Sequence, residues 1–394
     1  MAEWKECTIG DLCNSVSDTY RGKDEKVVLI NTSDVLEGKV LNHKVVENKK
    51  LKGQFKKTFK KSDILYSEIR PINKRFAFVD FDETSNYIAS TKLMVLRHKD
   101  NVLPEFLFVL LKSNYVIAEL QHLAETRSGT FPQITFSSEL APMKVNLPNK
   151  ETQKKIVSVL SCIEQKMSTN ELINNNLEQQ AQALYQELFV KNASSEWKIG
   201  TISDLGTVIG GSTPSKSKPE YYTERGIAWI TPKDLSVNKS KFVARGENDI
   251  TELGLKNSSA SIMQRGTVLF SSRAPIGYIA IAAGEVTTNQ GFKSVVPNPE
   301  IGTPFIYHFL KANLPIIEGM ASGSTFKEVS GSTMKIVPAL IPDEETLAKF
   351  NEFCTPLFEQ QRVLEEQNRA LSSMRDSLLP KLMSGDIDVS KVDI

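Results

Sequence analysis

The chain of 394 residues carries a long internal duplication, which restricts its fold more than any other feature. Short motifs of the first half return in the same order about 195 residues further along. Solenoid repeats have units of only about 20–50 residues, so this repeat indicates a duplicated domain. The returning pairs are Trp4-Lys5 and Trp197-Lys198, Thr8-Ile9 and Thr201-Ile202, Leu65-Tyr66-Ser67 and Leu269-Phe270-Ser271, Gly129-Thr130-Phe131 and Ser324-Thr325-Phe326, and Leu147-Pro148 and Ile341-Pro342.

Each copy consists of short alternating hydrophobic runs separated by turns rich in Gly, Asn, Asp and Ser. Such runs are typical of irregular β structure. A helical stretch begins at Pro104 in the first copy and near Pro304 in the second, and proline is favoured in the first turn of a helix. We therefore predict modules of the α/β (α+β) class, each followed by a long helix. The expected segments are 1–148, 149–192, 193–342 and 343–394.

Both long helices carry apolar heptads interrupted by amides, Asn170 and Asn174 in the first and Gln360 and Gln367 in the second. Sustained heptads favour coiled-coil pairing, and buried amides fix its register. We predict that the two helices pair antiparallel and separate the modules, giving a pseudo-twofold internal repeat. The alternative is that each helix packs only on its own module. The predicted seam residues are Ile156, Leu160, Ile163, Met167, Leu177, Leu184, Leu188, Phe350, Phe353, Leu357, Leu364, Leu371 and Leu378.

Composition places the chain among soluble globular proteins, with 40% hydrophobic and 24% charged residues. No apolar run is long enough to cross a bilayer, and the first ten residues lack the apolar core of a signal peptide. The four cysteines form no CxxC pair and no metal-ligand spacing. We expect a cytoplasmic protein with free thiols and no membrane partner.

Positive charge is concentrated in the first module, although the net charge of the chain is only +1. Seven lysines and no acidic residue occur between Lys49 and Lys61. Such an excess can neutralise several phosphates and bind nucleic acid in a salt-dependent way. A solvated lysine-rich surface explains the run equally well.

No catalytic motif is present. The segment Gly210-Gly211-Ser212-Thr213-Pro214 lacks the spacing and the lysine of a phosphate-binding loop, and neither a GxSxG nor an HExxH motif occurs. An adenine methyltransferase requires a Pro-Pro dipeptide in its base-binding tetrapeptide, and the chain has none. We predict a binding protein without a catalytic or metal site. A rival from another class is a nuclease with carboxylates at Asp63, Glu68, Asp80 and Asp82.

Several segments of the second half resemble the target-recognition domain of type I restriction–modification specificity subunits, the HsdS family. They are Gly210-Gly211-Ser212-Thr213-Pro214, Ile227-Ala228-Trp229-Ile230-Thr231-Pro232-Lys233-Asp234, Ala274-Pro275-Ile276-Gly277, Thr288-Asn289-Gln290-Gly291-Phe292 and Leu378-Leu379-Pro380-Lys381-Leu382. In the first half, Leu147-Pro148 and the stretch from Glu151 to Ile156 are similar to the start of the central helix in this family. The first module lacks the GGSTP and TNQGF segments, which suggests that the two modules read different sequences.

The resemblance implies a non-catalytic specificity subunit with two target-recognition domains, each reading one half of a bipartite, asymmetric double-stranded DNA target. It implies two adenine-N6 methyltransferase (modification) subunits as partners, and it allows two restriction/translocase subunits to join. Cofactors are then expected only in those partners, which bind S-adenosylmethionine, ATP and Mg. The alternatives are an orphan recognition protein serving another methyltransferase or nuclease, and an assembly scaffold that does not contact DNA.

Base edges are read mainly by Arg, Lys, Asn, Gln, Ser and Thr, and phosphates are held mainly by Lys and Arg. Asn289 and Gln290 have an alternative role, because they could also hydrogen-bond within a turn. The candidate DNA-binding residues of the second module are Ser212, Thr213, Lys216, Thr231, Lys233, Arg273, Asn289 and Gln290. Those of the first module are Arg70, Lys74, Arg75 and Lys92 for the groove and Lys56, Lys57, Lys60 and Lys61 for phosphates.

Overall fold

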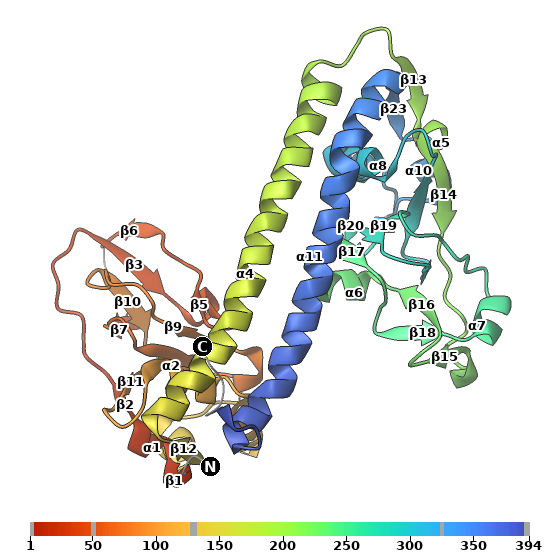
Figure 1. Cartoon of the computed structure of the whole chain (residues 1–394). Coiled ribbons are helices and arrows are strands. Elements are labelled where there is room, and N and C mark those ends of the chain that lie inside the picture. Colours follow the sequence, from red (N-terminus) through yellow and green to blue (C-terminus); the bar gives the residue numbers. More distant parts are fainter. Residues whose placement is uncertain (1–3, 49–52, 127–131, 324–326, 390–394) are drawn as a thin grey trace. The chain divides into compact units, whose positions relative to one another are not determined.

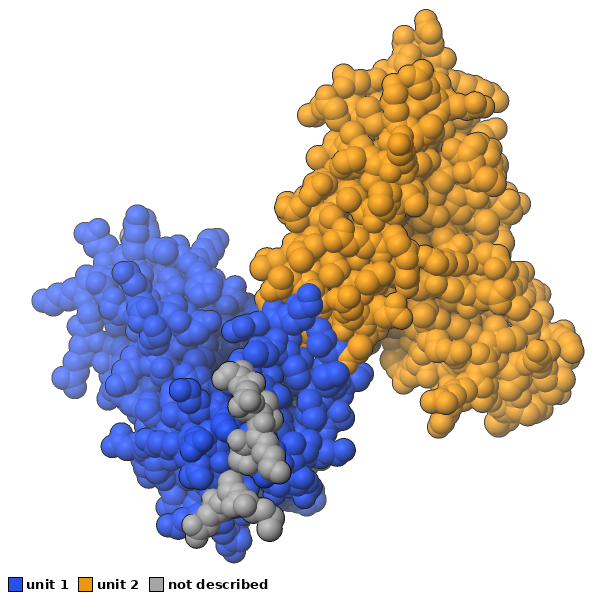
Figure 2. All heavy atoms as spheres, in the orientation of Figure 1, with its two compact units in different colours: residues 1–166, 371–394 blue, residues 167–370 orange. Residues whose placement is uncertain are grey.

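The computed structural model describes residues 4–48, 53–126, 132–323 and 327–389, and it forms two compact units (Figure 2). Unit 1 comprises residues 1–166 and 371–394, and unit 2 comprises residues 167–370. Each unit therefore contains one sheet module with part of each long helix, whereas the sequence predicted separate helical segments. The repeated motif at 129–131 and 324–326, and Lys49, Lys50 and Lys52 of the lysine run, lie outside the described residues.

Unit 1 has one sheet with the strand order β6-β3-β10-β7 and another with the order β2-β11-β8-β9 (Figure 1). Strands β1 and β12 form an antiparallel pair, as do β4 and β5. The strands are β1 (Trp4–Thr8), β2 (Cys13–Val16), β3 (Lys26–Ile30), β4 (Val35–Leu36), β5 (Lys39–Val40), β6 (Val45–Glu47), β7 (Phe55–Lys57), β8 (Ile64–Ser67), β9 (Phe76–Phe78), β10 (Tyr87–Ser90), β11 (Leu93–His98) and β12 (Lys144–Pro148). The helices are α1 (Ile9–Leu12), α2 (Pro104–Leu111), α3 (Asn114–Thr126) and α4 (Lys150–Gln186), which crosses the unit boundary, with short turns at Thr32–Asp34, Pro71–Asn73 and Phe136–Leu140.

Unit 2 has one sheet with the order β14-β22-β19-β20-β17 and another with the order β15-β18-β16-β21. Strands β13 and β23 pair antiparallel, as β1 and β12 do in unit 1. The strands are β13 (Lys198–Thr201), β14 (Gly206–Gly210), β15 (Tyr222–Thr223), β16 (Ile227–Ile230), β17 (Phe242–Val243), β18 (Asn248–Ile250), β19 (Val268–Ser272), β20 (Ile276–Ala282), β21 (Thr287–Thr288), β22 (Lys293–Pro297) and β23 (Pro338–Ile341). The helices are α5 (Ile202–Leu205), α6 (Pro232–Val237), α7 (Glu252–Lys256), α8 (Thr303–Ala312), α9 (Leu314–Gly319), α10 (Gly331–Lys335) and α11 (Glu344–Ser384), with turns at Glu187–Lys191 and Pro219–Tyr221.

The central strands of both units are buried on two faces. Along β19, Val268 and Phe270 pack in the cluster that contains the long helices, while Leu269 between them packs against the second sheet. In unit 1, Tyr66 packs in the cluster that contains the long helices, and Leu65 packs against the second sheet. Successive side chains of a strand point to opposite faces, so each central sheet lies between the helices and the second sheet.

The repeated motif Thr-Ile-x-Asp-Leu begins each copy with the same helix cap. The Asp11 carboxylate accepts a hydrogen bond from the Thr8 backbone N–H at 2.8 Å, and Asp204 accepts one from Thr201 at 2.8 Å. These are capping boxes, in which a side chain three residues into the helix satisfies a free backbone donor. The motif thus fixes the turn from the first strand into the first short helix of each unit.

Helices α4 and α11 run antiparallel, as Figure 1 shows within unit 2. The Asn170 Nδ2 donates to Asn368 Oδ1 at 2.8 Å, and Gln361 Nε2 donates to the Asn174 carbonyl at 3.0 Å. Residue numbers thus rise along α4 while those of its partners fall along α11. The predicted fold class, α+β modules with two long antiparallel helices, is confirmed by this arrangement.

The seam of α11 differs from the predicted one at Phe353 and Leu357. Phe350 and Leu364 are buried, but Phe353 is 45% exposed, and the buried positions are Cys354 and Phe358. The reason is that α11 packs on its own module as well as on α4, so its apolar face is rotated and widened. Along α4 the structure buries Ile156, Leu160, Ile163 and Leu177 and partly buries Met167 and Leu184, and Leu188 in the π-helical segment after α4 is also partly buried. Along α11 it partly buries Leu357, Leu371 and Leu378.

Candidate nucleic-acid interface

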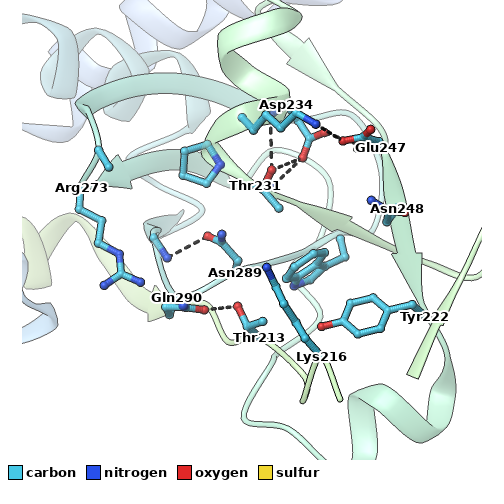
Figure 3. Close-up of a pocket in the computed structure, with 15 residues that line it drawn as sticks. Thr213, Lys216, Tyr222, Thr231, Asp234, Glu247, Asn248, Arg273, Asn289 and Gln290 are labelled. Carbon is cyan, nitrogen blue, oxygen red and sulfur yellow. Dashed lines mark hydrogen bonds and ion pairs between the residues drawn. The ribbon is translucent and has the colours of Figure 1, made fainter. Parts of the chain in front are cut away.

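Seven of the eight residues predicted for the second module line one hollow of about 710 Å³ in unit 2. In Figure 3 the labelled side chains surround a common space, with Arg273 on one side and Tyr222 and Lys216 on the other. The exception is Ser212, which does not line the hollow. The lining residues are Thr213, Lys216, Tyr222, Trp229, Thr231, Pro232, Lys233, Asp234, Glu247, Asn248, Arg273, Ala274, Asn289, Gln290 and Gly291.

One wall of the hollow is fixed by the cap of α6. Thr231 follows β16 as the N-cap, and Pro232 occupies the first turn, where its missing N–H costs nothing. The Asp234 carboxylate accepts from the Thr231 backbone N–H at 2.7 Å and from its hydroxyl at 2.6 Å. Its other oxygen accepts from the Glu247 N–H at 2.8 Å, which ties α6 to β18. The Thr231 hydroxyl therefore holds the wall together.

A second wall forms where the segment after β14 crosses the turn between β21 and β22. The Ser212 N–H donates to the Thr288 carbonyl at 2.8 Å, and the Ser212 carbonyl accepts from Trp229 Nε1 at 3.0 Å. A Cβ at Gly211 would lie 2.0 Å from the Asn289 carbonyl oxygen, so only glycine permits this crossing. Ser212 thus acts through its backbone, which explains why its side chain lies outside the hollow.

Several polar groups in the hollow are engaged within the fold. Asn289 Oδ1 accepts from the Gly291 N–H at 2.8 Å, and Gln290 Oε1 accepts from the Thr213 hydroxyl. Asn289 and Gln290 therefore adopt the alternative role of turn residues with their carbonyl oxygens. Among the described residues, the structure records no acceptor for their side-chain NH₂ groups. Each thus keeps two donors for a ligand.

The charges around the hollow are three cations and two carboxylates. Lys233 Nζ donates a hydrogen bond to Glu247 Oε2 at 2.6 Å, and this bond to the carboxylate raises the pKa of Lys233. Arg273 is paired with Glu328, which does not line the hollow. Lys216 is exposed and has no ion pair or hydrogen bond with any residue that the structure describes. An exposed, unpaired ammonium beside amide donors suits a phosphate oxygen or an acceptor on a base edge.

Five polar or aromatic lining residues were not predicted from the sequence: Tyr222, Trp229, Asp234, Glu247 and Asn248. Trp229 and Asp234 belong to the segment 227–234, in which only Thr231 and Lys233 were predicted to contact DNA. Tyr222 donates to the Pro214 carbonyl at 2.6 Å, a contact across the fold that has no local sequence signal.

Unit 1 repeats the backbone frame of this site with different side chains. In both units a parallel strand pair, β3 with β10 or β16 with β21, leads into a capping box, formed by Asn31 and Asp34 in unit 1. In the loop after β8 and in the loop after β19, the residue before the proline has a left-handed backbone conformation. Its φ is 46° at Arg70 and 50° at Ala274. The shared frame with altered side chains fits two modules that read different ligands.

The candidate residues of the first module lie in different environments. Lys57 Nζ donates to the carbonyls of Thr91 and Leu93 at 3.0 and 2.8 Å, and burial lowers its pKa, so it is a structural lysine and not a phosphate contact. Arg75 donates to the Ser33 carbonyl at 3.1 Å and supports the turn beside Asp34. The ion pairs of the others are Lys61 with Asp82, Lys74 with Glu37 and Lys92 with Glu68, while Lys56, Lys60 and Arg70 are exposed.

The carboxylates of the nuclease alternative do not converge. Asp63 is buried, and both of its oxygens accept hydrogen bonds from Arg97 at 2.8 and 2.7 Å. Glu68 accepts from Gln133, and Asp82 pairs with Lys61. Within the described ranges, no three His, Cys, Asp or Glu side chains are grouped as metal ligands would be. No helix among these residues combines the length and apolarity needed to span a membrane.

Comparison with known proteins gives one consistent result. The family model described as "Type I restriction modification DNA specificity domain" matches residues 1–179 and 194–369. The type I restriction enzyme HindI specificity subunit of Haemophilus influenzae is 32% identical over 464 residues, covering 98% of this chain and all of that protein. The MjaIX specificity subunit of Methanocaldococcus jannaschii is 37% identical over 46% of this chain and 44% of its own length. A crystal structure of the type I restriction–modification S subunit from M. genitalium shares the fold, with a TM-score of 0.61, 17% identity and coverage of 97% and 96%.

Proposed function

The chain belongs to the type I restriction–modification DNA specificity family, and from this premise we propose that it reads a bipartite, asymmetric DNA target. Unit 1 and unit 2 each read one half-site in a groove of the double helix. The chain itself supplies no catalytic group. It positions two adenine-N6 methyltransferase subunits, and two restriction/translocase subunits can join the complex in the cytoplasm.

The observation that carries this proposal is the hollow of unit 2. Its amide, ammonium and guanidinium donors converge from five separate segments of the module, which are held together by the Thr231–Asp234 cap and the Gly211 crossing. Base edges in the major groove present acceptors and donors in patterns that such side chains match. The side chains on the equivalent frame of unit 1 differ, so two different half-sites, and hence an asymmetric target, are expected.

The division of labour with the partners follows from the chemistry. A target adenine has to leave the base stack to be methylated, and the methyltransferase provides the pocket that receives it. Sequence reading and base capture are therefore separate tasks. S-Adenosylmethionine, ATP and Mg belong to the partner subunits in this scheme.

The test is a map of adenine methylation in cells that express this chain with its neighbouring methyltransferase. Cells that lack only this chain are measured in parallel. We expect a bipartite motif that disappears without the chain. The double variant Asn289→Ala/Gln290→Ala is expected to change one half-site and to leave the other intact, because both residues lie in unit 2.

The matched control is Lys256→Ala, which removes an exposed lysine of α7 that pairs with Glu252 and does not line the hollow. Its motif should equal that of the unaltered chain. If methylation is unchanged when the chain is absent, although the methyltransferase is active, the proposal is wrong. An orphan or scaffold role would then be favoured.

A further inference from the structure

Arg273 is held by a carboxylate that lies behind the hollow. Its NH1 donates to Glu328 Oε2 at 3.3 Å, and the other oxygen of Glu328 lies 3.5 Å from Lys293 Nζ. Lys293 also donates to the Gln290 carbonyl at 3.3 Å. Arg273 lines the hollow, whereas Glu328 and Lys293 do not. NH1 of the guanidinium is therefore engaged by Glu328, while Arg273 itself lines the hollow.

The remaining donors of Arg273 form a rigid edge. A guanidinium has five N–H donors in one plane, and within the described residues only NH1 of Arg273 has a recorded acceptor. The side chain is 37% exposed, which leaves this edge accessible. Two parallel N–H donors match the O6 and N7 acceptors that guanine presents in the major groove.

The way in which Arg273 is held favours a base over a phosphate as its ligand. Glu328 lies between Arg273 and Lys293, which balances its charge, so what Glu328 adds at Arg273 is an acceptor that orients the guanidinium. Lys216, on the opposite side of the hollow, has no such carboxylate and is fully available for a phosphate. A fixed fork is useful for reading a base, whereas phosphate contacts mainly position the protein.

The same place in unit 1 has no cation. In unit 2 the Ser272 N–H donates to the Gly291 carbonyl, and the Ser272 carbonyl accepts from the Val329 N–H. In unit 1 the Glu68 N–H donates to the Lys92 carbonyl, and the Glu68 carbonyl accepts from the Ile134 N–H. This equivalence puts Ile69 at the position of Arg273 and Gln133 at that of Glu328. An arginine fork at this position is therefore specific to the half-site of unit 2.

We propose, on the basis of the DNA-reading function proposed above, that Arg273 reads a guanine in the half-site of unit 2 and that Glu328 is its positioning residue. Arg273 recognises O6 and N7, and Glu328 holds the guanidinium in the orientation that this requires. Lys293 balances the charge of Glu328 and links it to the turn that carries Gln290.

The experiment measures adenine methylation over a plasmid library in which each position of both half-sites is varied in turn. The complex with the methyltransferase is used throughout. The arms are the unaltered chain, Arg273→Lys, Arg273→Ala, Glu328→Ala, Glu328→Gln and the control Arg265→Ala. Arg265 is an exposed arginine paired with Glu359 that lies outside the hollow. The melting temperature of each variant verifies its folding.

We expect Arg273→Lys to lose about five- to 150-fold of the preference for guanine at one position, because lysine keeps the charge but not the fork. Glu328→Ala should lose preference at the same position, and Glu328→Gln should retain part of it, since an amide oxygen can still accept from Arg273. The other half-site and the Arg265→Ala variant should be unaffected.

Three results would overturn the inference. A uniform loss over all sequences in Arg273→Ala, with normal preferences in Arg273→Lys, would make Arg273 a phosphate contact. A loss of base preference at a position where the target base is not guanine would contradict the assigned roles. So would a loss of base preference at different positions in the Arg273 and Glu328 variants. Absence of sequence-specific methylation with the unaltered chain would instead refute the proposed function, and this inference with it.

Discussion

At the scale of single residues, Gly211 decides how closely two segments of the hollow approach. A Cβ there would lie 2.0 Å from the Asn289 carbonyl and 2.4 Å from the Thr288 hydroxyl, and Thr288 is itself buried. Neither neighbour can move away without disturbing the turn that carries Asn289 and Gln290. The close crossing therefore links the stability of the module to the shape of its ligand site.

Replacement of Gly211 by alanine is expected to destabilise unit 2 by about 1–3 kcal/mol, the usual cost of overpacking. It should also weaken discrimination in one half-site only. Urea unfolding and the methylation map measure the two effects. Gly284→Ala is the control, because a Cβ at Gly284 meets no atom within 4 Å. Equal stability of both variants would contradict the tight crossing.

A second residue-scale feature is His308, which is only 2% exposed and packs on Tyr185 and Phe358. Burial lowers the pKa of His308 to about 3; Glu178 opposes this shift, while Lys241 and Lys311 reinforce it. The ring is thus neutral in the folded protein. In the unfolded chain it binds a proton near pH 6.5.

Because the folded pKa lies below the unfolded one, His308 costs stability as the pH falls from about 6.5 toward 3. The maximal slope is about 1.4 kcal/mol per pH unit for one proton. We expect His308→Phe to lack this contribution. Urea unfolding of both proteins between pH 4.5 and 6.5 measures the difference, and parallel pH profiles would show that His308 is protonated in the folded state.

The positions of seven residues that line the hollow were predictable from the sequence, but their hydrogen-bond partners were not. Thr231, Asn289 and Gln290 follow the ends of β16 and β21, which are parallel neighbours, so they come together in space. Thr213 follows β14, which belongs to the other sheet of unit 2. The sequence does not show which oxygen accepts from which donor. That Thr231 is bound by Asp234 could be anticipated from the capping-box spacing, whereas the contact of Thr213 with Gln290 links residues 77 positions apart.

At the scale of elements, the two long helices show where heptad reasoning succeeds and where it fails. The seam of α4 follows the prediction as far as Leu177. Beyond it the buried residues are Tyr185 and Phe189, whereas the predicted Leu184 and Leu188 are only partly buried. On α11, Phe358 turns toward the buried Lys241, whose Nζ lies 3.2 Å from the centre of the ring. Lys241 is in turn bound by Glu178 at 2.7 Å and Gln361 at 2.8 Å. Packing on the module therefore decides the register of α11, and a pattern read along one helix cannot show it.

This cluster also contains a shifted carboxyl group. Burial opposes the charge of Glu178, but Lys241 and Lys311 outweigh it and lower its pKa to about 2. Burial lowers the pKa of Lys241 to about 8, and Glu178 limits this decrease. Glu178 therefore stabilises the folded state above pH 4.5, and this contribution is lost as the pH falls toward 2.

The amide layer of the helix pair can be tested by a double-mutant cycle. Asn170 is fully buried and donates to Asn368, whose Nδ2 donates to the Met167 carbonyl at 3.1 Å. Asn170→Leu should cost about 0.5–1.5 kcal/mol, the net contribution of one intramolecular hydrogen bond, because it removes the donor to the half-buried Asn368 oxygen. Asn170→Leu combined with Asn368→Leu should cost less, since both partners are removed.

Urea unfolding measures the cycle, and Asn176→Leu, the same substitution at an exposed position of α4, is the control. Additive effects of the two single substitutions would mean that the amides do not act as a pair. A coupling between them would support the buried amides as the feature that holds the helices in one register.

At the scale of the whole molecule, the duplicated units share a core of corresponding strands but differ at the sheet edges, where unit 2 adds β15 and β17 and unit 1 has β7 beside β10. The paired strands β3–β10 and β16–β21 correspond, as do β1–β12 and β13–β23. The repeat and the class of fold were visible in the sequence, because both depend on motif order. The division into units was not visible in the sequence, because the motifs do not show that each module packs on part of both long helices.

If the two units read two half-sites, the helices α4 and α11 that connect them should set the gap between those half-sites. Removal of 165–171 from α4 together with 367–373 from α11 deletes one heptad from each helix. Asn170 and Asn368, which bond each other, are deleted together, so the remaining seam stays matched. Seven residues rise about 10.5 Å, or roughly three base pairs of B-DNA at 3.4 Å each. We therefore expect methylation of targets whose gap is shorter by about three base pairs.

Three base pairs also turn by about 100° around a duplex of 10–10.5 base pairs per turn, while a heptad leaves the helix faces almost unrotated. The shortened target must therefore be twisted, and we expect its methylation to be slower than that of the natural target by the unaltered chain. A plasmid library with fixed half-sites and gaps of every length measures both effects. Deletion of 165–171 alone is the control; it should abolish methylation at all gaps, because the seams no longer match. An unchanged preferred gap in the double deletion would contradict the spacer role of the helices while leaving the reading of each half-site intact.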